Sequence, residues 1–260
     1  MYDVYVAADV DDSVHIRCDA AALLLPSTAL FCGVTAAHLY GVPVPDRDER
    51  IHAAVPAGTP TVARIEKLKV HRYAIPAGHR TVLHGRRVVG PERLFLELAA
   101  AVPRIDLIVA GDHMLRHRIC AREQLNRFLR DCHRRRGVRK ARLAMPHLEP
   151  RSDSPPETRL RMLIVDANLP RPVANQDVFN DWGVWLARPD LSYPARKIAI
   201  EYEGVHHQRD HVQYSHDIER DGRLIDHGWL VIRVDKEGLF RAPRIVVNRV
   251  RKALAEHRPT

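Results

Sequence analysis

The stretch KIAIEYEG, residues 197–204, decides the fold of the C-terminal part of this chain. Its apolar residues alternate with others and its acids gather at the end, which predicts a strand that ends at Glu201 and Glu203. Residues two apart on a strand face the same side, so these two glutamates share one face. A turn at 193–196 precedes this strand, and hairpin pairing across the turn is expected to bring Asp190 near Glu201.

Working outward from this strand, the sequence predicts an α/β domain over residues 152–260. The run WLVIRV, residues 229–234, is typical of a buried strand, and residues 157–167 place leucines and isoleucine on one helical face. The turn-rich segment SDSPP, residues 152–156, marks the boundary of the domain. The predicted elements are a helix (157–167), strands (173–179, 184–191, 197–202), a helix (210–227), a strand (229–234) and a helix (242–256).

The first 115 residues predict a smaller α/β domain. Pro91 is expected to begin a strong helix over 91–101, because proline is favoured at the first position of a helix. Other helices are expected at 19–25, 28–40 and 104–115, and strands at 4–7, 51–55 and 69–73. Residues 116–151 are expected to form a basic helical linker between the two domains.

Charge points to an anionic partner. The 260 residues contain 41 Lys and Arg against 32 Asp and Glu, which gives a net charge of +9 and a pI near 9.7. Basic soluble proteins are biased toward nucleic acid, so we expect DNA, double-stranded or structured, as the partner, with a protein partner left open. A basic surface that is merely solvated, or a helix face that joins two domains, is the alternative. The cations predicted to contact phosphates are Arg134, Arg135, Arg136, Arg139, Lys140, Arg209 and Arg220.

The sequence argues against a membrane or secreted protein. No apolar run approaches the roughly 18 residues that a membrane span needs. The acidic N-terminus, residues 1–12, does not resemble a secretory signal. The four cysteines share no metal-like spacing, so we expect reduced thiols and a cytoplasmic location.

The converging carboxylates of the C-terminal domain suggest metal chemistry. Acids held together repel one another unless a cation compensates them. Oxygen ligands of this kind suit Mg²⁺ or Mn²⁺, either of which can activate water for attack on a phosphate. In the alternative interpretation these acids lie on the surface and pair with Arg188, Arg196 and Lys197.

A set of motifs over residues 152–255 resembles a widespread bacterial domain that is similar to the very-short-patch-repair (Vsr) endonucleases, within the PD-(D/E)xK nucleases. The motifs are SPPETRLR (154–161), RPDL (188–191), IEYEGVHH (200–207), DIERD (217–221) and GWLVIRV (228–234). The resemblance implies a restriction-endonuclease-like αβββαβ core.

The resemblance also implies roles for individual residues. Asp190 matches the PD aspartate, Glu201 the second acid, and Glu157 the metal-supporting acid of the first helix. Glu203 stands where the nuclease motif has lysine, so His206, His207 or Arg220 would have to take over its role. The alternatives are a helix-dipole charge for Glu157 and exposed loop residues for the histidines.

The first 115 residues more faintly resemble AbiEi-like antitoxins. The motifs are GVTAAHLYG (33–41) and RLFLELA (93–99). Such proteins usually begin with a winged helix-turn-helix, a module that this sequence does not show.

Two main hypotheses follow. The first is a metal-dependent DNA endonuclease or nickase, acting in repair or defence, in which Asp190, Glu201 and Glu157 bind the metal, Glu203 assists, and His206 and His207 transfer protons. The alternative is a non-catalytic, nucleic-acid-binding regulator of the type IV toxin–antitoxin kind with a nuclease-like fold. A plain protein-interaction module stays open as a third.

Overall fold

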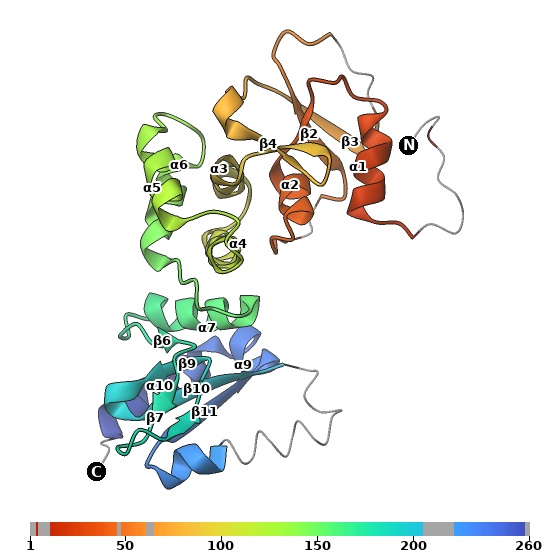
Figure 1. The fold of residues 1–260 in the computed structure, drawn as a ribbon. Helices are drawn as coiled ribbons and strands as arrows, with labels where there is room; N and C mark the ends of the chain where they lie inside the picture. The colour runs from red at the N-terminus through yellow and green to blue at the C-terminus, as the bar shows by residue number, and fades with distance from the viewer. Residues whose placement is uncertain (1–3, 5–10, 46–47, 61–64, 205–220, 258–260) are drawn as a thin grey trace. The chain divides into compact units, whose positions relative to one another are not determined.

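The computed structural model describes residues 4, 11–45, 48–60, 65–204 and 221–257. The contacts of the chain group into two units, Met1–Leu148 and Glu149–Thr260. Both units combine helices with sheets (Figure 1), which confirms the predicted α/β class.

A five-stranded sheet organises the first part of the N-terminal unit, with the strand order β3-β2-β1-β5-β4. β2 pairs in parallel with β3 and antiparallel with β1, while β5 pairs in parallel with β1 and antiparallel with β4. The strands are β1 (Leu30–Phe31), β2 (Ile51–Val55), β3 (Leu68–Arg72), β4 (Arg80–Leu83) and β5 (Arg86–Val89).

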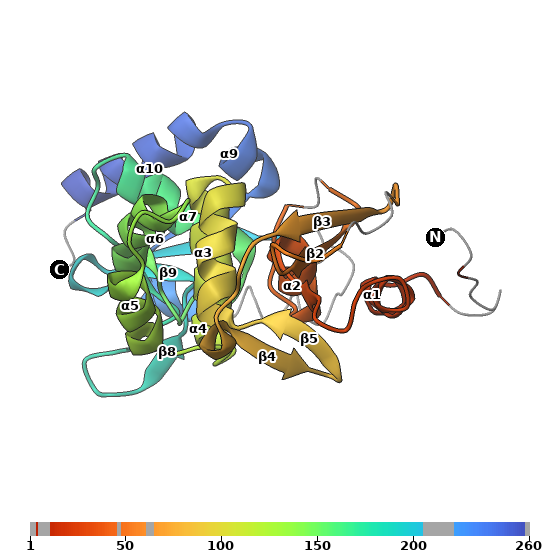
Figure 2. The ribbon, with the colours of Figure 1, turned by 90° about the horizontal axis from the view of Figure 1, so that it is seen from above.

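Two helices contribute to the core of this sheet, and Figure 2 shows them beside β2 and β3. α1 (Val14–Ala22) begins at Ser13, whose hydroxyl accepts the Ile16 N–H, and it buries Cys18 and Ala21. α2 (Gly33–Leu39) adds Leu39. The shared cluster is completed by Phe31, Ile51, Ala53, Leu68 and Val88.

The rest of the N-terminal unit is helical. Its helices are α3 (Pro91–Ala101), α4 (Arg104–Arg116), α5 (Arg122–Asp131) and α6 (Val138–Ala144), and α6 packs on both α3 and α4. Residues 116–151, for which the sequence predicted a basic helical linker, contain α5 and α6, which pack on their neighbours. Buried leucines such as Leu125 and Leu129 hold α5 in place.

The C-terminal unit contains a four-stranded sheet of order β11-β10-β9-β6 and a separate pair, β7-β8. β10 runs antiparallel to β9 and parallel to β11. The strands are β6 (Val173–Ala174), β7 (Val178–Phe179), β8 (Trp185–Ala187), β9 (Leu191–Tyr193), β10 (Ile198–Glu203) and β11 (Leu230–Asp235).

The two faces of β10 lie in different clusters. Ile198 and Ile200 pack with α7 (Pro155–Asp166) and α10 (Pro243–Glu256) in the main core of this unit. Ala199 faces the other way, toward residues of β7, β8 and the helical turn at 221–226. α9 (Lys236–Phe240) lies between β11 and α10 along the chain.

Several sequence predictions need correction. The helix expected at 28–40 is split into β1 and α2, because Gly33 adopts a positive φ of 54°. The strand expected at 173–179 is split into β6 and β7 by Asn175, whose φ is 43°, and the strand expected at 184–191 is interrupted at 188–190, which includes Pro189. β4, β5 and α9 were not predicted. Of the helix expected at 210–227, residues 221–226 are helical, and 210–220 lie outside the described residues.

Candidate functional site

Asp190 and Glu201 lie beside each other at the end of the β9–β10 hairpin, as the sequence predicted. The register pairs Ile200 with Leu191, the residue that follows Asp190. The Asp190 carboxylate accepts the backbone N–H of Tyr202 at 2.7 Å. Glu201 is only 5% exposed and therefore forms part of the interior of the unit.

Glu157 lies at the first turn of α7, where it is buried and acts as a hydrogen-bond acceptor. One carboxylate oxygen accepts the Ser154 hydroxyl at 2.7 Å. The other accepts the Asp153 N–H at 2.8 Å and the Asn175 amide at 2.6 Å. Since Asn175 also donates its N–H to the Asp190 carbonyl at 3.0 Å, it links α7 to the start of β9.

Glu203 is engaged by an arginine of the neighbouring strand. Arg233 on β11 forms an ion pair with Glu203 and donates its Nε to Asp221 at 2.9 Å. Burial alone would lower the pKa of Arg233, but its hydrogen bonds to Glu203 and Asp221 outweigh this and raise the pKa. Arg233 lies opposite Glu201 in the β10–β11 register, so a guanidinium stands beside this acidic cluster.

The described residues do not by themselves make a complete metal centre. Within them, no group of three or more His, Cys, Asp and Glu side chains is close enough to hold a metal. Glu157 is used as a cap and Glu203 as an ion-pair partner. The predicted site residues His206 and His207, and the predicted phosphate contacts Arg209 and Arg220, lie outside the described residues.

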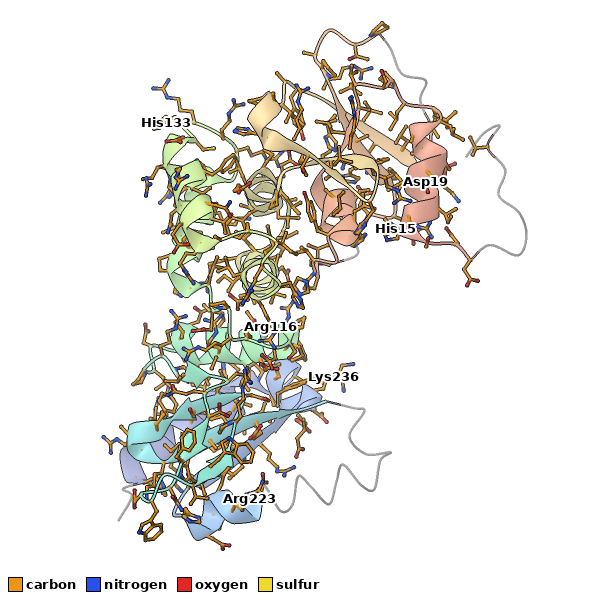
Figure 3. All side chains as sticks on the ribbon, in the orientation of Figure 1. His15, Asp19, Arg116, His133, Arg223 and Lys236 are labelled. Atoms are coloured by element: carbon orange, nitrogen blue, oxygen red, sulfur yellow. The ribbon has the colours of Figure 1, made fainter. Side chains whose placement is uncertain are left out.

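The second candidate site is the loop between α5 and α6, residues 132–137, which we call the basic loop; Figure 3 labels its His133. The side chains of Arg134, Arg135 and Arg136 are exposed, as is Arg139 in the first turn of α6. In the described part of the chain, no carboxylate forms an ion pair with these four arginines. Among the described residues they thus form a group of positive charges without an ion-pair partner, three on the basic loop and one at the start of α6.

The basic loop is held in place by close packing. Gly137 has φ +85°, and a Cβ there would lie 2.7 Å from the Ala100 nitrogen and 2.9 Å from the Leu96 oxygen. Only glycine allows such an approach to the backbone of α3 at this φ. The exposed arginines are therefore presented from a fixed backbone.

Two cations of α6 have structural roles instead. Lys140 is partly buried and donates to the Val102 carbonyl at the end of α3, at 2.8 Å. Arg142 donates to the Leu129 and Cys132 carbonyls at the end of α5, at 2.7 and 2.9 Å. Cations are favourable at helix C-termini, so we leave Lys140, a predicted phosphate contact, out of the proposed interface.

The two motifs that resemble AbiEi-like antitoxins meet through Glu97. Its carboxylate accepts the Gly33 N–H at 3.0 Å and the Arg93 Nε at 2.7 Å. It also accepts the Tyr73 hydroxyl at 2.8 Å. Glu97 thus joins the start of α2 to α3 and to the residue after β3, a role that maintains the fold.

His52 lies near this junction on β2 and is 7% exposed. Burial lowers its pKa, although the Asp48 carboxylate 3.0 Å from its Nε2 acts in the opposite direction. The same aspartate pairs with Arg50 and Lys69, and these partners hold the pKa of Asp48 well below its usual range.

Comparisons with known proteins find a family match for most of the N-terminal unit and relatives for the whole chain. Residues 29–145 match the family model described as the AbiEi antitoxin C-terminal domain. The chain is 27% identical to two Mycobacterium tuberculosis proteins, named Uncharacterized protein MT2308 and Uncharacterized protein Rv2248, over 97% of its own length and 90% of theirs. The solved structure titled Crystal structure of RV2827C protein, also from Mycobacterium tuberculosis, aligns with a TM-score of 0.39 and 16% identity over 65% of this chain and 66% of that one.

The family match confirms the antitoxin-like resemblance for these residues. The nuclease-like resemblance of residues 152–255 stays a prediction. In the part of the chain that the structure describes, no helix has the length and apolar character needed to cross a membrane.

Sequence reasoning missed two residues of the acidic site, Asn175 and Arg233. The sequence contained a sign of the role of Arg233, because this charged residue interrupts the otherwise apolar run WLVIRV. Asn175 had a weaker one, since asparagine tolerates a positive φ better than most residues. Their contacts with Glu157 and Glu203 come from segments distant in sequence.

Proposed function

We propose that this protein is a nucleic-acid-binding regulator of the antitoxin type, and that DNA contacts the exposed arginines of the basic loop. The observation that supports this most directly is the group of uncompensated arginines, Arg134, Arg135, Arg136 and Arg139, within the residues that match the antitoxin family model. Several carboxylates elsewhere in the unit do form ion pairs with cations, as Asp48 does with Arg50 and Asp19 with Arg86.

The chemistry of the arginines suits phosphate. A guanidinium stays charged at any physiological pH and presents a planar set of donors to phosphate oxygens. The loop backbone is fixed on α3 at Gly137, so binding orders only the side chains. Phosphate contacts of this kind give affinity and position, and little dependence on base sequence.

The test is the salt dependence of duplex DNA binding, measured by fluorescence anisotropy on the full chain. Each phosphate contact contributes about −0.9 to the slope of log K against log salt. Replacing Arg134, Arg135 and Arg136 with glutamine should reduce the steepness of this slope by up to about 2.7, three times that contribution.

A matched control separates local contacts from net charge. Arg241, Arg244 and Arg251 are exposed residues of the C-terminal unit, and their replacement by glutamine removes the same charge. The control triple should retain most of the affinity. Equal losses in both triples, or a flat salt response in the wild type, would contradict the proposal.

A second candidate function is Mg²⁺- or Mn²⁺-dependent endonuclease or nickase activity of the C-terminal unit. It is favoured by the position of Asp190, directly before β9, beside the buried Glu201 of β10. The described residues supply only part of a ligand set, and Glu203, which replaces the lysine of the nuclease motif, pairs with Arg233. For this reason it ranks second.

Plasmid nicking with Mn²⁺ and a thermal melt test the second candidate together. Metal should raise the melting temperature of the wild type, because a ligand of the native state stabilises it. Asp190→Asn should abolish both the shift and the nicking. A wild type that neither nicks plasmid nor responds to metal would remove this candidate and leave the regulator proposal untouched.

A further inference from the structure

The β7–β8 hairpin of the C-terminal unit exposes an unusual amount of apolar surface. Trp182 is 81% exposed, Val184 58%, Phe179 54% and Trp185 45%. Phe179 and Trp185 are partners in the strand register, so their side chains are neighbours on the outer face of the hairpin. Exposed clusters of large apolar side chains usually mark an interaction site.

The turn of this hairpin is ordered by its own hydrogen bonds. The Asn180 side-chain oxygen accepts the N–H of Trp182 at 3.0 Å and that of Val184 at 2.8 Å. Gly183, with φ +78°, donates its N–H to the Asn180 carbonyl at 3.0 Å. Trp182 is thus presented from a defined turn, so a partner would have little backbone to order on binding.

The inner face of the hairpin is anchored to the rest of the unit. Val178 and Leu186 are buried in a cluster with Leu224 and Trp229. The Asn180 amide lies 3.3 Å from the His227 ring nitrogen. The core of the unit is therefore filled without Phe179 and Trp182, and the packing of the hairpin does not account for their exposure.

The charge of this surface has the opposite sign to that of the chain. Residues 177–187 contain two aspartates, Asp177 and Asp181, and no lysine or arginine, although the net charge of the chain is +9. Both aspartates are exposed, as is Asp226 on the adjoining helical turn, which also contains the exposed Arg223. These acids would repel a phosphate backbone and attract a cation.

A cation already occupies one of the aromatic faces. The Arg223 guanidinium, labelled in Figure 3, lies 5.4 Å from the centre of the Trp185 ring, within cation–π range. The indole N–H of Trp185 donates to Asp177 at 2.9 Å, so a carboxylate and an aromatic face stand together. Trp182 and Asp181 are adjacent in sequence and offer the same pair of groups to a partner.

We propose that the β7–β8 hairpin is a docking surface for a protein segment that presents arginine or lysine side chains among apolar ones. The aromatic side chains would bury the apolar groups, and the ring faces and aspartates would bind the cations. Tryptophan is enriched among the residues that dominate binding energy, so Trp182 should be the centre of the contact. This docking is separate from DNA binding by the basic loop.

The test uses the full chain and a short synthetic peptide of alternating arginine and leucine. Binding is followed by calorimetry and by tryptophan fluorescence, since two of the three tryptophans, Trp182 and Trp185, lie on the hairpin. We expect binding that weakens with salt, a loss of at least tenfold in Trp182→Ala and a loss of a few fold in Asp181→Asn. Leu143→Ala, which trims an apolar side chain that is 59% exposed in the other unit, should bind as the wild type does.

Any of the following outcomes would overturn the proposal. Equal binding of a glutamate–leucine peptide would show non-specific apolar adhesion. Binding of oligothymidine that Trp182→Ala weakens would assign the hairpin to nucleic acid, and a dimer in sedimentation that the same substitution dissociates would assign it to a second copy. Asp181→Asn keeps every aromatic ring, so an unchanged affinity in that variant would refute the charge argument even if Trp182→Ala fails to fold.

Discussion

Replacing Gly137 with alanine tests the account of the basic loop. The new Cβ would lie 2.7 Å from the Ala100 nitrogen, 2.9 Å from the Leu96 oxygen and 3.0 Å from the Ala99 carbonyl carbon. All three are backbone atoms of α3, which cannot move aside as a flexible side chain does. The α6 end of the loop must then shift away from α3.

Two costs add. An alanine in the left-handed region of backbone space loses about 1–2 kcal/mol. Overpacking against a rigid neighbour costs about 1–3 kcal/mol more. We therefore expect Gly137→Ala to lower the free energy of unfolding of the N-terminal unit by about 2–5 kcal/mol.

Gly41 offers a matched control in the same unit. Its φ is +70°, and a Cβ there would meet nothing within 4 Å. Gly41→Ala should therefore be destabilised only by the left-handed backbone conformation and not by overpacking. Urea unfolding followed by circular dichroism measures both variants, because all three tryptophans lie in the C-terminal unit and fluorescence would not report on this one. A Gly137→Ala protein no less stable than Gly41→Ala would refute the packing argument.

Three further outcomes are expected. Burial lowers the pKa of His52 below its ordinary 6.5, so the unfolded state takes up a proton more readily than the folded state. Stability is therefore fully present above pH 6.5 and is lost as the pH falls from 6.5 through the lowered pKa of the folded state. Thermal melts between pH 7.5 and 5.5 should show the loss, and His52→Gln should reduce it. Lys140→Met should cost about 1 kcal/mol by removing the cap on the Val102 carbonyl, yet leave the salt slope of DNA binding unchanged. Glu157→Gln should destabilise the protein by about 1–3 kcal/mol, because the amide of Asn175 loses its charged acceptor, whereas a carboxylate held mainly for a metal would give a more stable apo protein.

The sequence indicated the elements that have a strong local signal. The helix at 91–101 was predicted with its observed bounds, because Pro91 at its start and regularly spaced leucines specify it without help from the rest of the chain. The strand that contains Glu201 was predicted within one residue at each end. The short strands were predicted less well: β6 and β7 were expected as one strand, and β9 begins where the strand expected at 184–191 ends, since two or three residues contain too little pattern to define an edge.

The candidate sites, too, were predicted from the sequence only in part. The proximity of Asp190 and Glu201 followed from the sequence, because a hairpin with a short turn pairs residues at predictable offsets. The positive charge of residues 134–140 was also visible in the sequence, but nothing there distinguished Lys140 from the neighbouring arginines.

By itself, then, the sequence determined the α/β class, the elements with a strong local pattern such as α3 and β10, the basic character of the chain and the acids that meet across one hairpin. The tertiary structure decided how each charged side chain is used: Lys140 caps α3, Arg233 pairs with Glu203, and the Arg134 side chain stays exposed. It also showed that the aromatic side chains of the β7–β8 hairpin face outward. The physical reason is that periodicity and turn chemistry are local, whereas the partner of a charge or the burial of a ring depends on segments brought together only when the chain folds.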